Sequence, residues 1–390
     1  ALVLLKRPEF VGGGVYAIPT ANLSGSTTFN QTIPLAPGVN LKRKLTEPLS
    51  PTDGGRPAIV PSFHFAIPGG ERVTYGLSVV APLGLATNWP SDSPLRYQAT
   101  YSHLTTTELS PQMGGLITDN IAVGLGTNFQ WANVNYNSVL GAPPLAQLQG
   151  KPPTYYDTTT SNHGNSFGIG FHAGILLKTD DNKSRLGVSY AYGVTQQFYG
   201  SSSLEGRLAG GLANSYFRSN GLSTNPIKFP DILNFSLYQQ INDKTAMLGS
   251  IVYTLWSTYQ QTSFYDAALP GATPTKPVFT SSSATSNYRN SVRAAFGMNH
   301  QLTEQWQFRW GGGYDQTPTN PEYRDVRLPD VDRLAIGGGI HWQTNQYLGW
   351  DVGYSYLFPL SSTEIHRTQV FSPNANDRVD VSGHSYAQLI

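Results

Sequence analysis

One stretch decides the fold: WQFRWGGGYD at residues 306–315, followed by RLAIGGGIHW at 333–342 and LGWDVGYSYLF at 348–358. In each segment every second residue is aromatic, aliphatic or small, and the residues between them are mostly polar or Gly. A period of two over this length predicts β-strands with one apolar face and one polar face. The polar face carries charged residues such as Arg309 and Asp351.

Two classes of protein use such strands. A soluble sheet would turn the aromatic face to a core, whereas a membrane barrel turns that face to lipid and the charges to its lumen. The chain favours the barrel, because alternating segments follow one another throughout and their connections alternate between short turns and long loops. We therefore predict an all-β fold, a transmembrane antiparallel β-barrel of about 14 strands, in which residues 1–390 form a single domain. The long, extracellular loops are expected at about 28–58, 138–164, 200–227 and 262–286.

The composition is compatible with this fold. Lys and Arg number 25 and Asp and Glu 24, and a net charge of +1 gives no reason to expect nucleic acid as a partner. Charged residues make up 13% of the chain, about half the usual fraction of a soluble domain. No segment approaches the roughly 20 consecutive apolar residues of a membrane-spanning helix. The mean hydropathy of −0.27 does not argue against a barrel, since alternating strands average their two faces.

Residue patterns for catalysis or for metal and cofactor binding are missing from the sequence. Cys is absent, and the 8 His residues are scattered singly without an HExxH motif. No GxSxG elbow or Walker loop occurs. Ser382 and His384 share a strand face, but nothing else supports a hydrolase. We therefore predict no catalytic residues, no metal and no cofactor.

Two of the long loops are unusually apolar. Leu204, Leu208, Leu212 and Tyr216 recur every four residues and predict a short amphipathic helix, although Gly210 and Gly211 weaken it. The loops either pack against each other as a lid or expose a surface on which a hydrophobic ligand lands. The candidate capture residues are Leu140, Leu145, Leu148, Leu204, Leu208, Leu212 and Phe217.

The strand expected near 288–300 places two cations in the lumen. Phe296 and Met298 belong to its apolar face, which turns Arg289 and Arg293 inward. These arginines either form a structural salt-bridge ladder with neighbouring Asp residues, or one of them, Arg289, is free to hold a ligand carboxylate.

Several motifs resemble those of the FadL-type long-chain fatty acid transporters. DQTP at 315–318, followed by RLPDVDR at 327–333, carries the most specific similarity. Further matches follow in the same order along nearly the whole chain: RPEF (7–10), GVY (14–16), FHFA (63–66), GLAT (84–87), WS (256–257) and DVGYSY (351–356).

The resemblance implies an outer-membrane barrel closed by an N-terminal hatch, with passive uptake of hydrophobic molecules. In that family a groove between loops captures the ligand, an inner pocket binds it, and an opening beside a kinked third strand releases it sideways. Pro82 and Gly84 stand where the kink is expected. The family's two basic carboxylate-binding positions align with Asn133 and Arg289. The chain begins at about the end of the hatch and lacks a terminal aromatic residue, so we expect truncation at both ends.

Together these features predict a passive transporter, and no enzyme, in the outer membrane of a Gram-negative bacterium. Its expected ligand is a long-chain fatty acid; its other partners are outer-membrane lipid and lipopolysaccharide, and the protein is expected to be a monomer. Uptake of monoaromatic hydrocarbons by the same route is one alternative, because only one of the two basic positions is a cation. A general diffusion porin is the other alternative.

Overall fold

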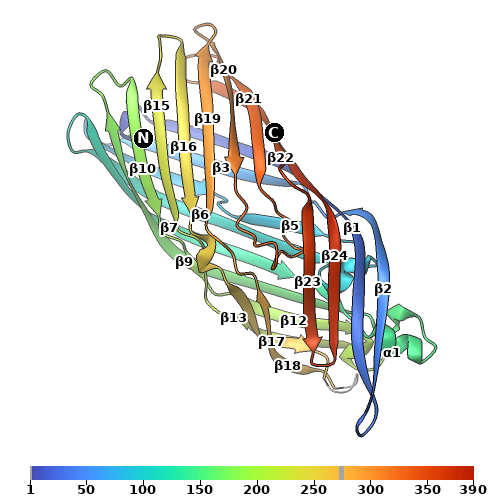
Figure 1. The fold of residues 1–390 in the computed structure, drawn as a ribbon. Coiled ribbons are helices and arrows are strands. Elements are labelled where there is room, and N and C mark those ends of the chain that lie inside the picture. The colour runs from blue at the N-terminus through green and yellow to red at the C-terminus, as the bar shows by residue number, and fades with distance from the viewer. Residues whose placement is uncertain (1, 272–275) are drawn as a thin grey trace.

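The structure is a computed structural model that describes residues 2–271 and 276–390. A hydrogen-bonded ring of 14 antiparallel strands forms a closed barrel (Figure 1). The last strand of the ring pairs with the first, so the ring has no free edge to meet lipid. In order around the ring the strands are β1 (Glu9–Ala36), β3 (Ala58–Pro68), β4 (Val73–Val80), β6 (Tyr101–Leu116), β7 (Ile121–Tyr136), β9 (Thr158–Lys178), β10 (Ser184–Ala191), β15 (Ile232–Gln240), β16 (Thr245–Thr254), β19 (Ser291–Gln301), β20 (Trp306–Asp315), β21 (Arg333–Gln343), β22 (Gly349–Pro359) and β24 (Ala375–Leu389).

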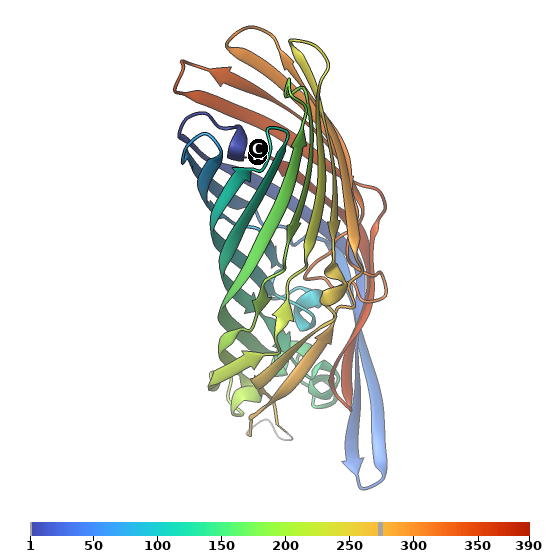
Figure 2. The same cartoon turned by 90° about the vertical axis from the view of Figure 1, so that its left-hand side faces the viewer.

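The two ends of the barrel differ. At the short-turn end, tight turns such as 69–72 and 241–244 join neighbouring strands. At the long-loop end, further strands extend beyond the ring, and the hairpin of β1 and β2 projects farthest (Figure 2). The strands that do not belong to the ring are β2 (Val39–Asp53), β5 (Gly84–Asn88), β8 (Ser138–Leu140), β11 (Thr195–Gln196), β12 (Tyr199–Gly206), β13 (Tyr216–Thr224), β14 (Ile227–Lys228), β17 (Gln261–Leu269), β18 (Val278–Thr285) and β23 (Thr363–Ser372).

Helical structure is confined to short pieces. Every helix in the described part of the chain is too short or too polar to cross a membrane. The first 3₁₀ turn packs against β4 and β6, and its Leu2 side chain lies beside Gly76 and Gly114. The helical segments are α1 (Pro143–Leu148), η1 (Leu2–Leu4), η2 (Pro94–Tyr97), η3 (Pro153–Tyr156), η4 (Arg207–Ala209) and η5 (Trp256–Thr258).

The alternation that predicted the strands is confirmed in β20–β22. Trp306 lies opposite Trp342, which in turn lies opposite Trp350, and all three indoles are exposed on the outer face. Such a row of aromatics near one end of the strands is typical of the girdle of a membrane barrel. Arg309 and Asp351, on the other face, form an ion pair of 2.7 Å in the lumen.

The segments expected as long loops contain much regular structure. Residues 28–58 hold the β1–β2 hairpin, 138–164 hold β8, α1, η3 and the start of β9, and 200–227 hold β12 and β13. Residues 262–286 hold most of the pair β17–β18, except that 272–275 lie outside the described residues.

Two expectations about local structure are wrong. The proposed amphipathic helix is instead β12, η4 and β13, because Gly206 and Gly211 adopt positive φ angles of 135° and 92° that end the strand and the turn. The Thr-rich alternation at about 95–109 predicts a strand that starts near Leu95, whereas the fourth ring strand begins at Tyr101. The Ser93 hydroxyl caps the amide of Leu95 and Pro94 occupies the first turn, which favours a 3₁₀ helix there.

Candidate functional site

The wall of the ring is interrupted between β4 and β5, at residues 81–83, which we call the wall break. β4 pairs with both β3 and β6, whereas β5, within the described part of the chain, pairs with β6 alone among the ring strands. Pro82 lies in the wall break and has no N–H to donate to a ladder. Gly84 is the first residue after the wall break. The structure thus places both residues of the expected kink at a discontinuity in the barrel wall.

An apolar cluster lines the inside of the barrel next to the wall break. Leu83, from the break itself, packs against it. Phe198, Ile227 and Phe229 reach it from the segments around β11 and β14, which pair with each other outside the ring ladder. This inner cluster consists of Leu83, Leu104, Ala132, Val134, Phe198, Ile227, Phe229 and Tyr259.

Polar groups replace the inner cluster toward the short-turn end. The buried carboxylate of Glu108 accepts hydrogen bonds from Gln130 at 2.8 Å and from Ser110 at 3.1 Å. Gln196 of β11 donates to the Gln130 side chain at 3.0 Å. An apolar molecule that packed against these polar groups would remove them from water at a cost in free energy. The apolar lining of the lumen therefore ends at this polar layer. In the sequence Glu108 belongs to no motif that marks it as a functional residue.

The β20–β21 connection, residues 316–332, crosses to the opposite wall and is called the crossing loop. The indole of Trp89, just after β5, donates to the Val326 carbonyl at 3.1 Å. Arg327 is buried, stacks on Tyr136 at 3.5 Å, and donates to the Ser102 hydroxyl at 2.7 Å. The crossing loop therefore fixes the chain beside the wall break to the β20–β21 side of the barrel.

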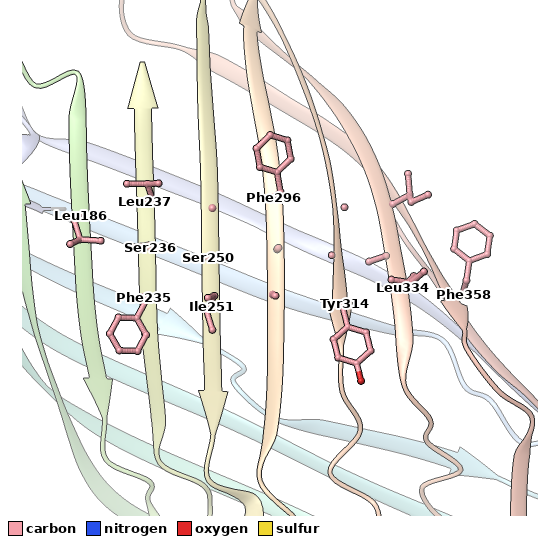
Figure 3. Close-up of a pocket in the computed structure, with 17 residues that line it drawn as sticks. Leu186, Phe235, Ser236, Leu237, Ser250, Ile251, Phe296, Tyr314, Leu334 and Phe358 are labelled. Atoms are coloured by element: carbon pink, nitrogen blue, oxygen red, sulfur yellow. The ribbon is translucent and has the colours of Figure 1, made fainter. Parts of the chain in front are cut away.

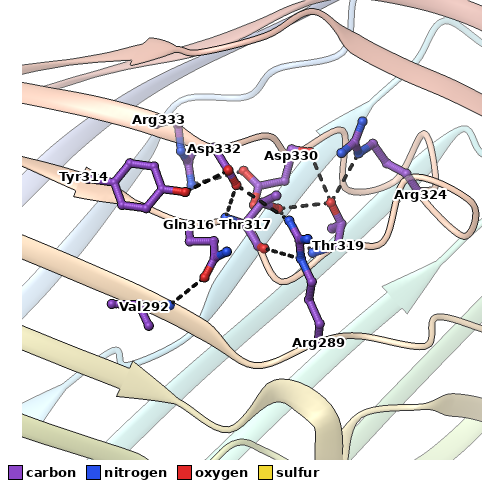
Figure 4. Close-up of polar contacts among 10 residues, drawn as sticks. All are labelled: Arg289, Val292, Tyr314, Gln316, Thr317, Thr319, Arg324, Asp330, Asp332 and Arg333. Carbon is purple, nitrogen blue, oxygen red and sulfur yellow. Dashed lines mark hydrogen bonds and ion pairs between the residues drawn. The ribbon is translucent and has the colours of Figure 1, made fainter.

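Arg289 lies in a cluster of charges at the start of the crossing loop (Figure 4). Its guanidinium is 3.9 Å from the Asp332 carboxylate and donates to the Thr317 carbonyl at 3.5 Å, and 49% of the side chain is exposed. Arg333 is held more tightly, by Asp330 at 3.1 Å and Asp315 at 3.4 Å. A long, half-exposed ion pair contributes little, so Arg289 can exchange Asp332 for another anion at small cost.

The other two carboxylate candidates lie in different surroundings. Arg293 is exposed and stands opposite Asp315, and its side chain makes no ion pair or hydrogen bond within the described residues. Asn133 shares its strand face with the exposed Trp131, whereas Ala132 between them is buried. Asn133 therefore lies on the outer face, where it donates to Asn165 at 2.6 Å, and does not line the lumen with the arginines.

The candidate capture residues divide into two groups. Leu140, Leu204 and Leu208 are buried together in one core cluster, and Phe217 packs against it. These side chains hold the long-loop end together, as the lid interpretation expected. Leu148 and Leu212 are exposed, and Leu145 is half-buried. Only the second group leaves apolar surface open to a ligand.

An apolar cavity lies on the outside of the barrel (Figure 3). It measures about 730 Å³. Small residues such as Gly249, Ala294 and Gly312 leave room there between exposed side chains such as Phe235 and Phe296. Because these side chains share the lipid-facing side of their strands, the cavity faces the bilayer and does not belong to the lumen. Among the described residues no group of three His, Asp or Glu could hold a metal ion.

The long-loop end also contains a buried carboxyl group. Asp377 is fully buried, and Gln98 donates to its carboxylate at 2.8 Å. Burial raises the pKa of Asp377 from 3.8 to about 6, although the hydrogen bond from Gln98 opposes the shift. The raised pKa means that the folded state binds this proton more tightly than the unfolded state, so protonated Asp377 adds to the free energy of unfolding. This contribution is complete below pH 3.8 and is lost as the pH rises through about 6.

We therefore expect the long-loop end of wild type to become less stable by ~2–3 kcal/mol between pH 4 and pH 7, relative to the variant Asp377→Asn. Asn lacks the ionisation but can still accept the hydrogen bond from Gln98. Hydrogen exchange of β23 and β24, followed across this pH range in both proteins, measures the difference. Equal pH dependence in the two proteins would show that Asp377 ionises normally.

Comparison with known proteins gives the same fold. The sequence profile of the outer membrane protein transport protein family (OMPP1/FadL/TodX) matches residues 1–390. The long-chain fatty acid transport protein of Escherichia coli O6:H1 is 26% identical over 384 residues, which cover 91% of this chain and 78% of that protein. The crystal structure of a Pseudomonas aeruginosa FadL homologue has a TM-score of 0.76 at 20% identity and covers 100% of this chain and 90% of that one. The toluene transporter TbuX of Ralstonia pickettii has a TM-score of 0.60 at 16% identity, covering 99% and 90%.

Proposed function

Because the chain belongs to the OMPP1/FadL/TodX family of outer-membrane proteins that transport hydrophobic compounds, we propose that it takes up long-chain fatty acids. The E. coli relative is named for that transport, and TbuX for transport of toluene. The choice between the two ligands depends on whether the lumen offers a site for a carboxylate.

The observation that carries the transport route is the contact between the wall break and the inner cluster. Leu83 belongs to both, so a ligand on the inner cluster lies next to the discontinuity in the wall. The polar layer around Glu108 opposes movement of an alkyl chain toward the short-turn end. The ligand therefore leaves sideways into the bilayer.

Such a route needs no energy source. A long alkyl chain gains about 0.8 kcal/mol for each methylene that it removes from water, first on the exposed Leu148 and Leu212, then on the inner cluster, and finally in lipid. The barrel only has to carry the chain past the polar surface of the outer leaflet.

Arg289 is the proposed carboxylate partner. We expect Arg289→Ala to lower oleate uptake by about tenfold, because a charge-assisted hydrogen bond contributes ~1.5–3 kcal/mol. Toluene uptake should not change, because toluene has no anionic group. Labelled oleate and toluene, supplied to cells with equal amounts of folded protein in the outer membrane, give both rates.

Arg309→Ala is the matched control, since Arg309 is a lumen-facing arginine paired with Asp351 and distant in sequence from the wall break. It should leave both rates unchanged. Unaltered oleate uptake in Arg289→Ala would exclude the carboxylate role, and an equal loss for oleate and toluene would make Arg289 a structural residue. Arg293→Ala then tests the second lumen cation in the same way.

The monoaromatic alternative stays open because Asn133, which was expected to be a carboxylate partner, is neutral and faces outward, away from the lumen. Faster uptake of toluene than of oleate by wild type, unaffected by either arginine variant, would favour it. A general diffusion porin would instead give stable ion conductance in planar bilayers.

A further inference from the structure

A second discontinuity lies in the wall on the opposite side of β7 from the wall break. β10 pairs with residues 172–178 of β9, and β12 pairs with residues 158–165 of the same strand. Between them no strand of the described chain forms a ladder with residues 166–171 on that side, because the chain turns inward through β11. Val194 fills the space over Gly168 and Gly170, where side chains would clash with it.

A groove of about 600 Å³ remains on the outer side of this discontinuity, and we call it the interface groove. Its aromatic members, Trp131, Phe167 and Tyr199, are each about half exposed, and the rings of Trp131 and Phe167 lie 5.1 Å apart. The groove is lined by Trp131, Asn165, Ser166, Phe167, Thr195, Gln197, Tyr199 and Pro226.

The interface groove lies where the lipid-facing band ends. Along β9 the outward side chains Phe171, Ile169 and Phe167 give way to Asn165 and His163 toward the long-loop end. Aromatic residues concentrate at this depth in membrane barrels, where the acyl region meets the head groups. The groove therefore meets the sugar or phosphate part of an outer-leaflet lipid together with the start of its acyl chains.

A cluster of amide and imidazole groups borders the groove on its head-group side. Asn133 donates to Asn165 at 2.6 Å, the ring of His163 lies 3.2 Å from the Asn135 side-chain oxygen, and Asn165 lies 3.4 Å from the other ring nitrogen of His163. We call Asn133, Asn135, His163 and Asn165 the amide cluster. Amide and imidazole groups offer both donors and acceptors, which suits hydroxyl groups.

Charge argues against a phosphate ligand. Among the residues that the structure describes, no Lys, Arg, Asp or Glu lines the interface groove or belongs to the amide cluster. Lys228, which pairs with the groove residue Thr195, is already bound to Asp231 at 2.9 Å. Phosphate recognition relies on Arg or on free Lys, and neither is offered here.

We propose that the interface groove binds the saccharide head group of an outer-leaflet glycolipid. The aromatic side chains of Trp131 and Tyr199 offer apolar faces to the C–H groups of a sugar ring, and Asn165 and Gln197 offer hydrogen bonds to its hydroxyls. The acyl chains continue along the exposed Phe167, Ile169 and Phe171 of β9.

Native mass spectrometry tests this site. The protein is released from nanodiscs that hold equal amounts of a monoglucosyl diacylglycerol, phosphatidylethanolamine and phosphatidylglycerol with identical acyl chains. We expect the glucolipid to be enriched on wild type by about fivefold over its share of the bilayer, which corresponds to ~1 kcal/mol of preference. Trp131→Leu and Tyr199→Leu should each return the bound lipids to the bulk ratio.

Trp350→Leu is the matched control, because Trp350 is an equally exposed aromatic residue on the outer face of β22. It should retain the enrichment, and heat-modified gel mobility confirms that each variant is folded. Equal loss in Trp350→Leu would show a general effect of interfacial aromatics and overturn the site. Enrichment of phosphatidylglycerol, or none on wild type, would also overturn it.

Discussion

Arg96→Ala is expected to destabilise the long-loop end by ~3–5 kcal/mol while the ring of strands stays closed. Only 2% of the Arg96 side chain is exposed, and it binds the Asp157 carboxylate at 2.8 Å and the Glu47 carboxylate at 3.2 Å. It also donates to the Tyr97 hydroxyl at 2.9 Å. Removing the guanidinium leaves two partly buried carboxylates without a counter-charge, which is the costly way to break such a pair.

The consequence reaches several elements, because each partner of Arg96 belongs to a different one. Glu47 lies on β2, Asp157 follows η3, and Tyr97 packs on Phe29 of β1 at 5.1 Å. η2, which carries Arg96, is the first element after β5 and the wall break. Loosening η2 therefore frees both the long-loop end and the strand beside the proposed exit.

Limited proteolysis measures this effect. Residues at the long-loop end should be cleaved much faster in Arg96→Ala than in wild type, while heat-modified gel mobility still reports a folded barrel. Arg218→Ala is the control. Arg218 is exposed and donates a hydrogen bond to the side chain of Asn220 at 2.9 Å, so its loss should change stability by less than about 0.5 kcal/mol. Cleavage at the wild-type rate in Arg96→Ala would mean that Arg96 is not needed to hold the long-loop end.

The ring strands could be predicted from sequence, because a two-residue period is a local property of the chain. The 3₁₀ turn at Leu95 could also have been predicted from Ser93 and Pro94, but the Thr-rich alternation after it favoured an early strand start. The outward position of Asn133 follows from parity alone, since Trp131 stands two residues earlier on the same face. The resemblance to the family instead placed Asn133 among the carboxylate-binding residues of the lumen, and this expectation is wrong.

The inner polar contacts could not be predicted in this way. Arg327 binds Ser102, which is 225 positions away in the sequence, and Gln98 binds Asp377 across 279 positions. Nothing local to Arg327 shows that the crossing loop turns into the barrel instead of out to water. The role of Glu108 depends likewise on Gln196, whose segment leaves the ring and enters the lumen. Such contacts become visible only when the strands are placed in three dimensions.

Gly84→Trp is expected to reduce uptake of any hydrophobic ligand to the level of cells that lack the protein. Gly84 is exposed directly after the wall break, and a Cβ atom there would meet only the Leu104 carbonyl, at 3.7 Å. The position therefore has room for a side chain, and the fold should tolerate it. Gly84 pairs with the exposed Thr105, so the indole would stand on the outer face, where we expect it to cover the opening through which the ligand leaves the inner cluster.

Two controls separate a closed exit from a damaged barrel. Gly249→Trp introduces the same side chain at a ring position that also has open space, on β16 away from the wall break, and should leave uptake unchanged. Gly84→Ala should retain most of the uptake, because a methyl group leaves the opening clear. Normal oleate uptake by folded Gly84→Trp would show that the ligand does not pass the wall break. Binding of oleate to the purified variant should persist, since the inner cluster is untouched and only release is blocked.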